Sequence, residues 1–193
     1  MYRIVTTPDP VLAKRAQEVI KFDAKLKEVL QEMRKTLLAT EDPIGVGLAA
    51  PQVGISMRIF QMKPTEKSVV TNFINPVIVD ISESEGILKK LNSENVEKNK
   101  PKSSKKRLLE GCLSIPNIWG NVTRKKEITV AFQDENGVSH TKHFKGFPAV
   151  IIQHEMDHLN GILFTKHVME QKEKLYKSHK NEEGEDEFDE IKI

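Results

Sequence analysis

The chain has 193 residues, of which 38% are hydrophobic and 30% charged, and its formal net charge is +2 at pH 7. This length fits one domain with a sizeable core, the small net charge gives no argument for a nucleic-acid partner, and no apolar run is long enough to span a membrane. The single cysteine, Cys112, excludes an intrachain disulfide. Because the N-terminus also lacks a signal-peptide pattern, we expect a protein of a reducing compartment, the bacterial cytoplasm.

The first strong element in chain order is a helix from Asp23 to about Thr40. Asp23 is a good N-cap, and Pro43 follows the expected end. Apolar residues recur at helical spacing along one face, at Leu26, Val29, Leu30, Met33 and Leu37. We interpret this segment as a structural helix that faces the core.

The segment 45–54 is apolar and rich in glycine, and its one polar side chain is the uncharged Gln52. A phosphate-binding loop is not favoured, since neither a P-loop Lys-Ser/Thr pair nor a GxGxxG pattern is present. Glycines also let a ligand approach the backbone closely. Three strands are expected next, over 57–61, 69–74 and 77–81, with Asn75-Pro76 separating the last two.

The segment 82–107 is rich in Ser, Asn, Glu and Lys and lacks a sustained apolar period. We expect a mobile insertion or long loop with no more than one short helical turn. The alternative is a basic patch for an anionic partner such as RNA, because Lys105-Lys106-Arg107 ends the segment.

A β-hairpin is expected over 128–133 and 138–144, around a turn that contains Asn136-Gly137. The apolar run 149–152 is rich in β-branched residues and is compatible with a strand. The i, i+4 spacing of His154 and His158 instead favours a helix from about Pro148 to Asn160. Residues 169–193 are charged; we expect them to be weakly helical, with an acidic stretch that frays.

The motif His154-Glu155-Met156-Asp157-His158 carries the chemistry. On a helix, the two imidazoles share one face and would hold a single metal ion, with Glu155 beside the open position as a general base. The apolar run before the motif predicts burial, which would be costly for these groups without a cation. The residues leave the third ligand open among the other histidines, Cys112 and several carboxylates. A metzincin pattern fails because position 164 is Phe.

Three motifs together resemble the peptide deformylase family. They are the segments 45–52, 110–114 and 153–159, they occur in the family's order, and the resemblance spans about residues 1–168. It implies a single α+β domain with antiparallel sheets packed around a central buried C-terminal helix that carries the HExxH motif. The segment 82–107 is then an insertion, and residues 169–193 form a charged C-terminal tail.

The resemblance implies a metal site with Cys112, His154 and His158 as ligands and water in the fourth position. The expected metal is iron(II), with zinc, nickel or cobalt able to substitute. The implied reaction is hydrolytic removal of the formyl group from the N-terminal formylmethionine of newly made polypeptides.

In that reaction Glu155 acts as base and then acid, while the Gln52 amide and the Leu113 backbone N–H stabilise the oxyanion. Four apolar side chains are implied to line the methionine pocket: Val46, Phe147, Val150 and Ile151. The backbones implied to bind the extended peptide are those of Val46, Gly47 and Gly111.

Two rival functions remain at this point. One is a deformylase-like protein that binds metal or nascent chains without turnover. The other is a general zinc endopeptidase, which the Gln52 loop and the Cys112 motif argue against. The insertion 82–107 has three readings: it alters substrate access, contacts the ribosome, or has no role. No membrane partner and no specific nucleic acid is expected.

Overall fold

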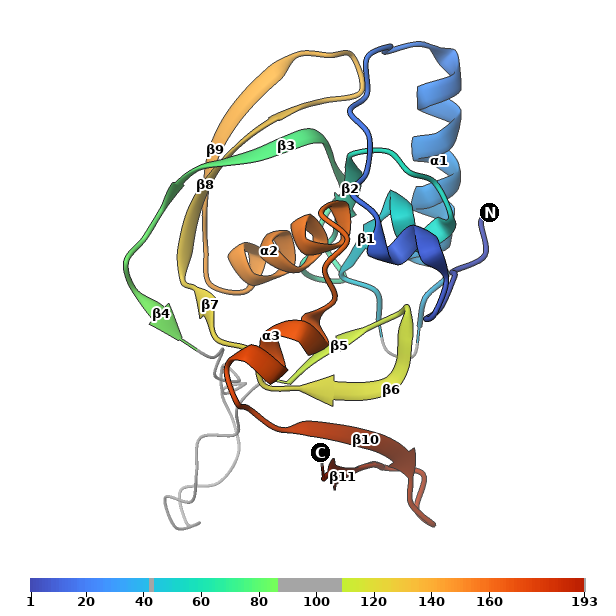
Figure 1. Cartoon of the computed structure of the whole chain (residues 1–193). Helices are drawn as coiled ribbons and strands as arrows, with labels where there is room; N and C mark the ends of the chain where they lie inside the picture. Colours follow the sequence, from blue (N-terminus) through green and yellow to red (C-terminus); the bar gives the residue numbers. More distant parts are fainter. Residues whose placement is uncertain (42–43, 87–108, 193) are drawn as a thin grey trace.

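The structure, a computed structural model, describes residues 1–41, 44–86 and 109–192 (Figure 1). Its elements in chain order are η1 (Pro10–Ala13), α1 (Ala24–Leu38), β1 (Gly47–Ala49), η2 (Ala50–Val53), β2 (Ile59–Met62), β3 (Thr71–Ile81), β4 (Glu85–Gly86), β5 (Glu110–Cys112), β6 (Ile115–Gly120), β7 (Arg124–Lys125), β8 (Glu127–Gln133), β9 (Ser139–Lys145), α2 (Phe147–Leu159), α3 (Phe164–Glu170), β10 (Leu175–Lys180) and β11 (Asp186–Ile191). The predicted α+β class with antiparallel sheets is confirmed. None of the described helices has the length and apolar character needed to cross a membrane.

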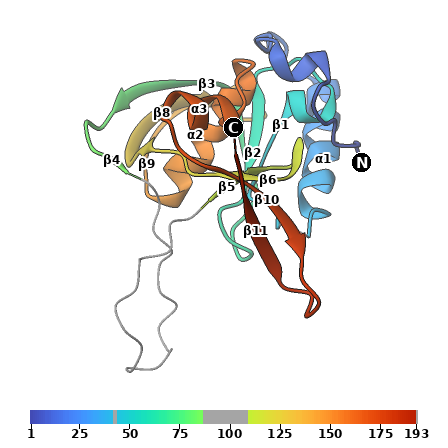
Figure 2. The ribbon, with the colours of Figure 1, turned by 60° about the horizontal axis from the view of Figure 1, so that its bottom comes forward.

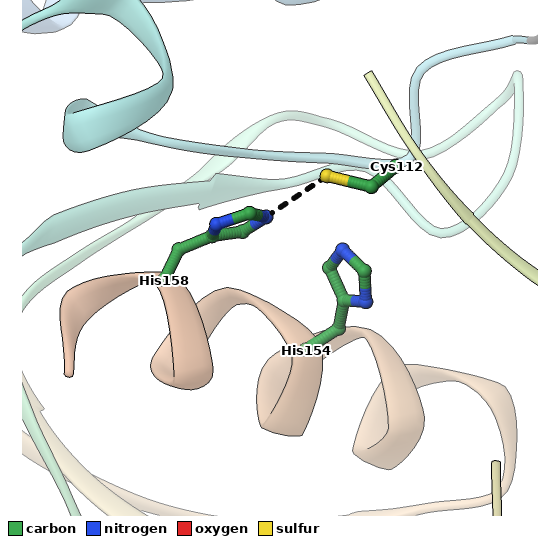
Figure 3. Close-up of side chains that lie close together, drawn as sticks. All are labelled: Cys112, His154 and His158. Atoms are coloured by element: carbon green, nitrogen blue, oxygen red, sulfur yellow. Dashed lines mark hydrogen bonds between the residues drawn. The ribbon is translucent and has the colours of Figure 1, made fainter. Parts of the chain in front are cut away.

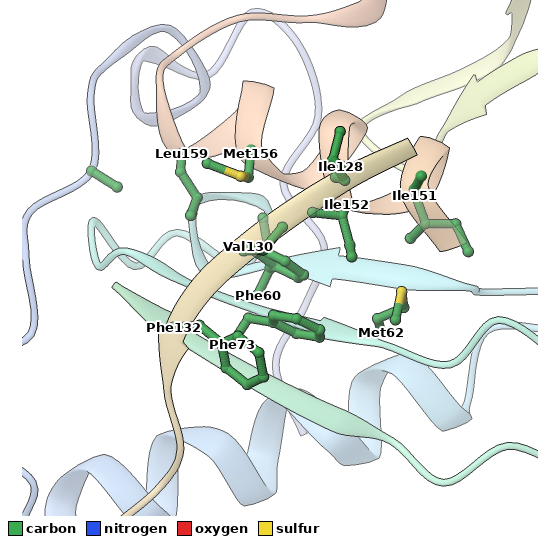
Figure 4. Close-up of a cluster of buried hydrophobic side chains, with 13 residues drawn as sticks. Phe60, Met62, Phe73, Ile128, Val130, Phe132, Ile151, Ile152, Met156 and Leu159 are labelled. Atoms are coloured by element: carbon green, nitrogen blue, oxygen red, sulfur yellow. The ribbon is translucent and has the colours of Figure 1, made fainter. Parts of the chain in front are cut away.

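The largest sheet is antiparallel, with strand order β1-β2-β3-β8-β9. Strand β2 is buried along its whole length because its side chains alternate between two helices. Phe60 packs in a cluster with residues of α2, whereas Ile59 packs with residues of α1. Figure 4 shows the first of these clusters, in which Phe60 stacks on Phe73 with ring centroids 4.5 Å apart beneath Ile152. The sheet therefore holds α2 in a fixed position.

The helix expected over 23–40 is confirmed as α1. The Asp23 carboxylate caps it by accepting a hydrogen bond of 3.0 Å from the backbone N–H of Leu26. All five apolar residues predicted to face the core are buried. The hairpin is also confirmed, as β8 and β9, and Gly137 adopts the positive φ of 79° that its turn requires.

The strands expected over 69–74 and 77–81 are joined in one strand, β3, so the predicted break at Asn75-Pro76 is wrong. The register with β8 shifts between Ile74 and Val77, and Asn75 has a φ of 49°. A bulge admits a proline without losing the strand. The Asn75 side chain supports this bulge through two 2.8 Å hydrogen bonds with the backbone of Val19.

The C-terminal segment is not weakly helical, as expected, but forms the hairpin β10–β11, which extends the second sheet in the order β11-β10-β6-β5. Figure 2 shows this hairpin projecting from the body beside β6. Strand β11 pairs with β10 along its whole length. Two exposed ion pairs offset its acidic charge: Lys180 pairs with Asp186 at 2.8 Å, and Lys174 pairs with Glu190 at 2.6 Å. On its other side, β10 pairs with the edge of β6, which the sequence does not reveal.

Of the insertion predicted over 82–107, only the first residues are described, and Glu85 and Gly86 of β4 pair with β7. Residues 87–108 lie outside the described residues. Helix α3 packs against the second sheet through a small apolar cluster, which consists of Val122, Phe164, Val168 and Leu175.

Candidate metal centre and active site

Helix α2 carries His154, Glu155 and His158. It begins after Gly146, whose φ is 65°, and has Pro148 in its first turn, where a missing N–H is tolerated. One turn of helix separates the two histidines, so their rings lie together with centroids 5.1 Å apart. The sequence thus presents two imidazoles toward the same region.

Cys112, at the end of β5, meets this pair from the second sheet (Figure 3). Its Sγ lies 3.2 Å from Nε2 of His158. One ligand atom from each of Cys112, His154 and His158 lies within 4.8 Å of the others. Metal–sulfur and metal–nitrogen bonds are about 2.0 to 2.3 Å long, so a small adjustment of the side chains brings all three to one ion. A thiolate with two imidazoles suits iron(II), zinc and related ions.

His158 is almost fully buried, and its Nδ1 has no hydrogen-bond partner among the described residues. Burial holds the pKa of His158 well below its usual range. This keeps the imidazole neutral, which is the form that binds a metal ion.

Glu110 orients the other imidazole. Its Oε2 lies 3.2 Å from Nδ1 of His154, which leaves Nε2 of that ring for the metal. Burial favours the neutral acid, but hydrogen bonds from Arg124 and His154 outweigh it and lower the pKa of Glu110 to about 2. Glu110 is therefore a carboxylate at neutral pH.

Arg124 links this carboxylate to the histidine helix. Its Nε and Nη2 each donate to Glu110 at 2.9 Å, and its Nη1 donates to Asp157 at 2.6 Å. Asp157 also contacts Nε2 of His167 on α3 at 2.9 Å. The guanidinium is 6% exposed, so the two carboxylates around it satisfy a buried cation. This network fixes β5 against α2, the two elements that supply the three candidate ligands.

Glu155 follows His154 and is 4% exposed. Its Oε2 has no hydrogen-bond partner among the described residues, and burial raises the pKa of this carboxyl to about 7. A Cβ at Gly47 would lie only 2.2 Å from its Oε1, so only glycine at that position leaves room for the carboxylate.

Gln52 lies on η2 and is 2% exposed. Its Oε1 accepts a 2.8 Å hydrogen bond from the backbone N–H of Ala49, which fixes the orientation of the amide. Its Nε2 consequently points at Cys112, 3.5 Å from Sγ. An uncharged donor is thus held beside the candidate metal ligands.

These groups share one cavity of about 240 Å³. Of the residues singled out from the sequence, all but His158 line it: Val46, Gly47, Gln52, Gly111, Cys112, Leu113, Phe147, Val150, Ile151, His154 and Glu155. His158 is 1% exposed and is not part of the lining, but its Nε2 lies beside Cys112, which is. The arrangement brings a candidate metal-binding triad, a carboxylate and an amide donor together at one apolar cavity, a set of groups that suits metal-assisted hydrolysis.

Sequence reasoning missed Arg124 and Trp119. Arg124 lies 14 residues from Glu110 and 33 from Asp157 along the chain, outside every motif, so only the fold reveals its contacts. Trp119 also lines the cavity. The one available signal was that it is the chain's only tryptophan.

Comparison with known proteins identifies the family. A family model described as polypeptide deformylase matches residues 1–174. The peptide deformylase of Thermotoga neapolitana is 39% identical over 163 residues, which cover 84% of this chain and 84% of the relative. That of Christiangramia forsetii is 36% identical over 190 residues, which cover 91% and 85%, respectively.

Solved structures agree. The crystal structure of peptide deformylase from Thermotoga maritima superposes with a TM-score of 0.71 at 38% identity, covering 86% of this chain and 97% of that one. A Plasmodium falciparum peptide deformylase in complex with an inhibitor gives a TM-score of 0.68 at 38% identity, covering 88% and 93%. The chain therefore belongs to the polypeptide deformylase family.

Proposed function

We propose that this chain removes the formyl group from the N-terminal formylmethionine of newly synthesised polypeptides, at a metal ion held by Cys112, His154 and His158. The observation that carries the proposal is that Cys112 and His154 line one apolar cavity with Glu155 and Gln52, while His158 lies beside Cys112 within reach of the same ion. Membership of the deformylase family gives the reaction class.

The metal is proposed to be iron(II), with zinc, nickel or cobalt able to replace it. The donor set supports this range, since thiolate and imidazole ligands suit all four ions. When bound, the ion supplies a Lewis acid that activates water and polarises the formyl carbonyl. Glu110 keeps His154 oriented for binding through its contact with Nδ1.

Glu155 is proposed to take the proton of the attacking water and to return it to the departing amine. Its burial supports both roles: a carboxyl with a pKa of about 7 exchanges a proton readily near neutral pH. We assign stabilisation of the oxyanion, which develops on the formyl oxygen, to the Gln52 amide and the Leu113 backbone N–H. The hydrogen bond from Ala49 orients Gln52 as a donor before substrate arrives.

The peptide is proposed to bind in extended form between two sheet edges. Within the described part of the chain, β1 ends one sheet and β5 ends the other, and both line the cavity. Val46, Gly47 and Gly111 lie at or beside these two edges, and their backbone groups suit strand-like pairing with the peptide. The methionine side chain is assigned to the apolar wall formed by Val46, Phe147, Val150 and Ile151.

An anaerobic assay of formate release from formyl-Met-Ala-Ser tests the proposal. Iron-loaded wild-type protein should release formate, and Glu155→Ala should retain the metal but lose most of the rate. The rival without turnover predicts that both proteins bind the peptide and that neither releases formate. Metal analysis of both samples ensures that a negative result cannot come from an empty site.

A further inference from the structure

Trp119 lines the cavity but belongs to none of the three motifs. Its indole Nε1 donates a 3.0 Å hydrogen bond to Oγ of Ser178 on β10. Its ring meets Phe188 of β11 edge-on, with centroids 5.9 Å apart and an interplanar angle of 83°. Both contacts come from the C-terminal hairpin, so the hairpin fixes the position of this ring.

Strand register places this ring over β5, the strand that ends at Cys112. Trp119 is paired with Gly111 of β5 on one side and with Tyr176 of β10 on the other. Directly paired residues share a sheet face. A Cβ at Gly111 would lie 2.7 Å from the indole, so the ring rests directly on Gly111, the residue before Cys112. The neighbouring Gly120 faces the opposite way, toward Val168 of α3.

The part of the cavity that Trp119 lines has no role yet in binding the formyl group or the methionine side chain. The formyl group must lie near Cys112 and Glu155, and the methionine side chain is assigned to the wall formed by Phe147 and its neighbours on α2. A peptide that pairs with the edge of β5 then continues along Gly111, where the indole covers the strand.

We infer that Trp119, held by Ser178 and Phe188, is a specificity-determining residue that contacts apolar side chains after the second residue of the formylmethionyl peptide. The hairpin β10–β11 thereby acts as a positioning element for substrate selection. This inference rests on the proposed function. The recognised ligand is an extended formylmethionyl peptide with aliphatic or aromatic side chains after its second residue.

The inference is tested by measuring kcat/KM for formate release from three peptides: formyl-Met-Ala, formyl-Met-Ala-Gly-Gly and formyl-Met-Ala-Leu-Leu. Wild type should prefer the Leu-Leu peptide, and Trp119→Ala should lower its kcat/KM roughly 3- to 10-fold more than that of formyl-Met-Ala, mainly through KM. Trp119→Phe should keep most of the preference. Phe188→Ala should lose part of it, whereas Val138→Ala, at an exposed position in the β8–β9 turn, should lose none.

An equal loss for all three peptides would show that Trp119 is merely structural and would overturn the inference. Inactivity of wild type on formyl-Met-Ala would instead contradict the proposed function itself. The two failures are therefore distinguishable.

Because Trp119 is the only tryptophan, its fluorescence gives a readout that needs no variant of the ring. In a Glu155→Gln background, which prevents turnover, saturation with the Leu-Leu peptide should shift emission to shorter wavelength. The Gly-Gly peptide at the same occupancy, measured by equilibrium dialysis, should shift it less. Identical emission with both bound peptides would overturn the inference even if Trp119→Ala does not fold.

Discussion

The substitution Gly47→Ala isolates the packing of Glu155. A Cβ at position 47 would lie 2.2 Å from Oε1 of Glu155 and 2.8 Å from Cδ, whereas ordinary contact begins at 3.4 Å. The carboxylate must therefore move by roughly 1 Å, and it is too buried to do so freely. A misplacement of roughly 1 Å in a catalytic group costs about 100-fold in rate, or about 2.7 kcal/mol of activation free energy.

The assay is formate release from formyl-Met-Ala-Ser under iron-loaded, anaerobic conditions. We expect kcat to fall about 100-fold while the bound metal stays stoichiometric, because the atoms nearest to a Cβ at position 47 all belong to Glu155. Gly45→Ala is the matched control in the same loop. The atoms nearest to its Cβ would be those of Leu37 and Thr40, at 3.0 to 3.1 Å.

A double-mutant cycle gives the decisive result. If Gly47→Ala acts through the carboxylate, it should add nothing in a Glu155→Ala background. A further large loss there, or an unchanged kcat for the single variant, would refute the reasoning.

Three further predictions concern the donor, the buried network and the metal. Gln52→Ala should lower kcat about 100- to 1,000-fold with little change in KM, and steady-state kinetics at matched metal content will check this. Arg124→Met should leave the largely buried carboxylates of Glu110 and Asp157 without their guanidinium partner and cost about 3 to 5 kcal/mol of unfolding free energy, measured by urea titration. An unchanged midpoint would contradict the network's role. Chelation should lower Tm and abolish formate release, and iron(II), cobalt or nickel should restore both. Cys112→Ser should weaken that recovery, measured by calorimetric titration of metal into the stripped protein.

Local sequence determined the elements whose stabilising contacts are close along the chain. Asp23 and the apolar period of α1 specified a capped helix. Asn136-Gly137 specified the hairpin β8–β9. The pairing of His154 with His158 likewise needs only the helical repeat. The third candidate ligand, Cys112, came from motif resemblance, because no local rule places residue 112 beside residue 158.

Only tertiary structure decided the features that depend on distant partners. The strand β3 continues through Asn75-Pro76 because Val19 satisfies the bulge. The charged C-terminal segment becomes a hairpin because β6 offers an edge and cations face its acidic strand. Short-range propensity contains no information about such an edge. For the same reason the sequence supplied the reactive groups of the site, whereas the fold decided that Arg124 links β5 to α2 and that Trp119 covers Gly111.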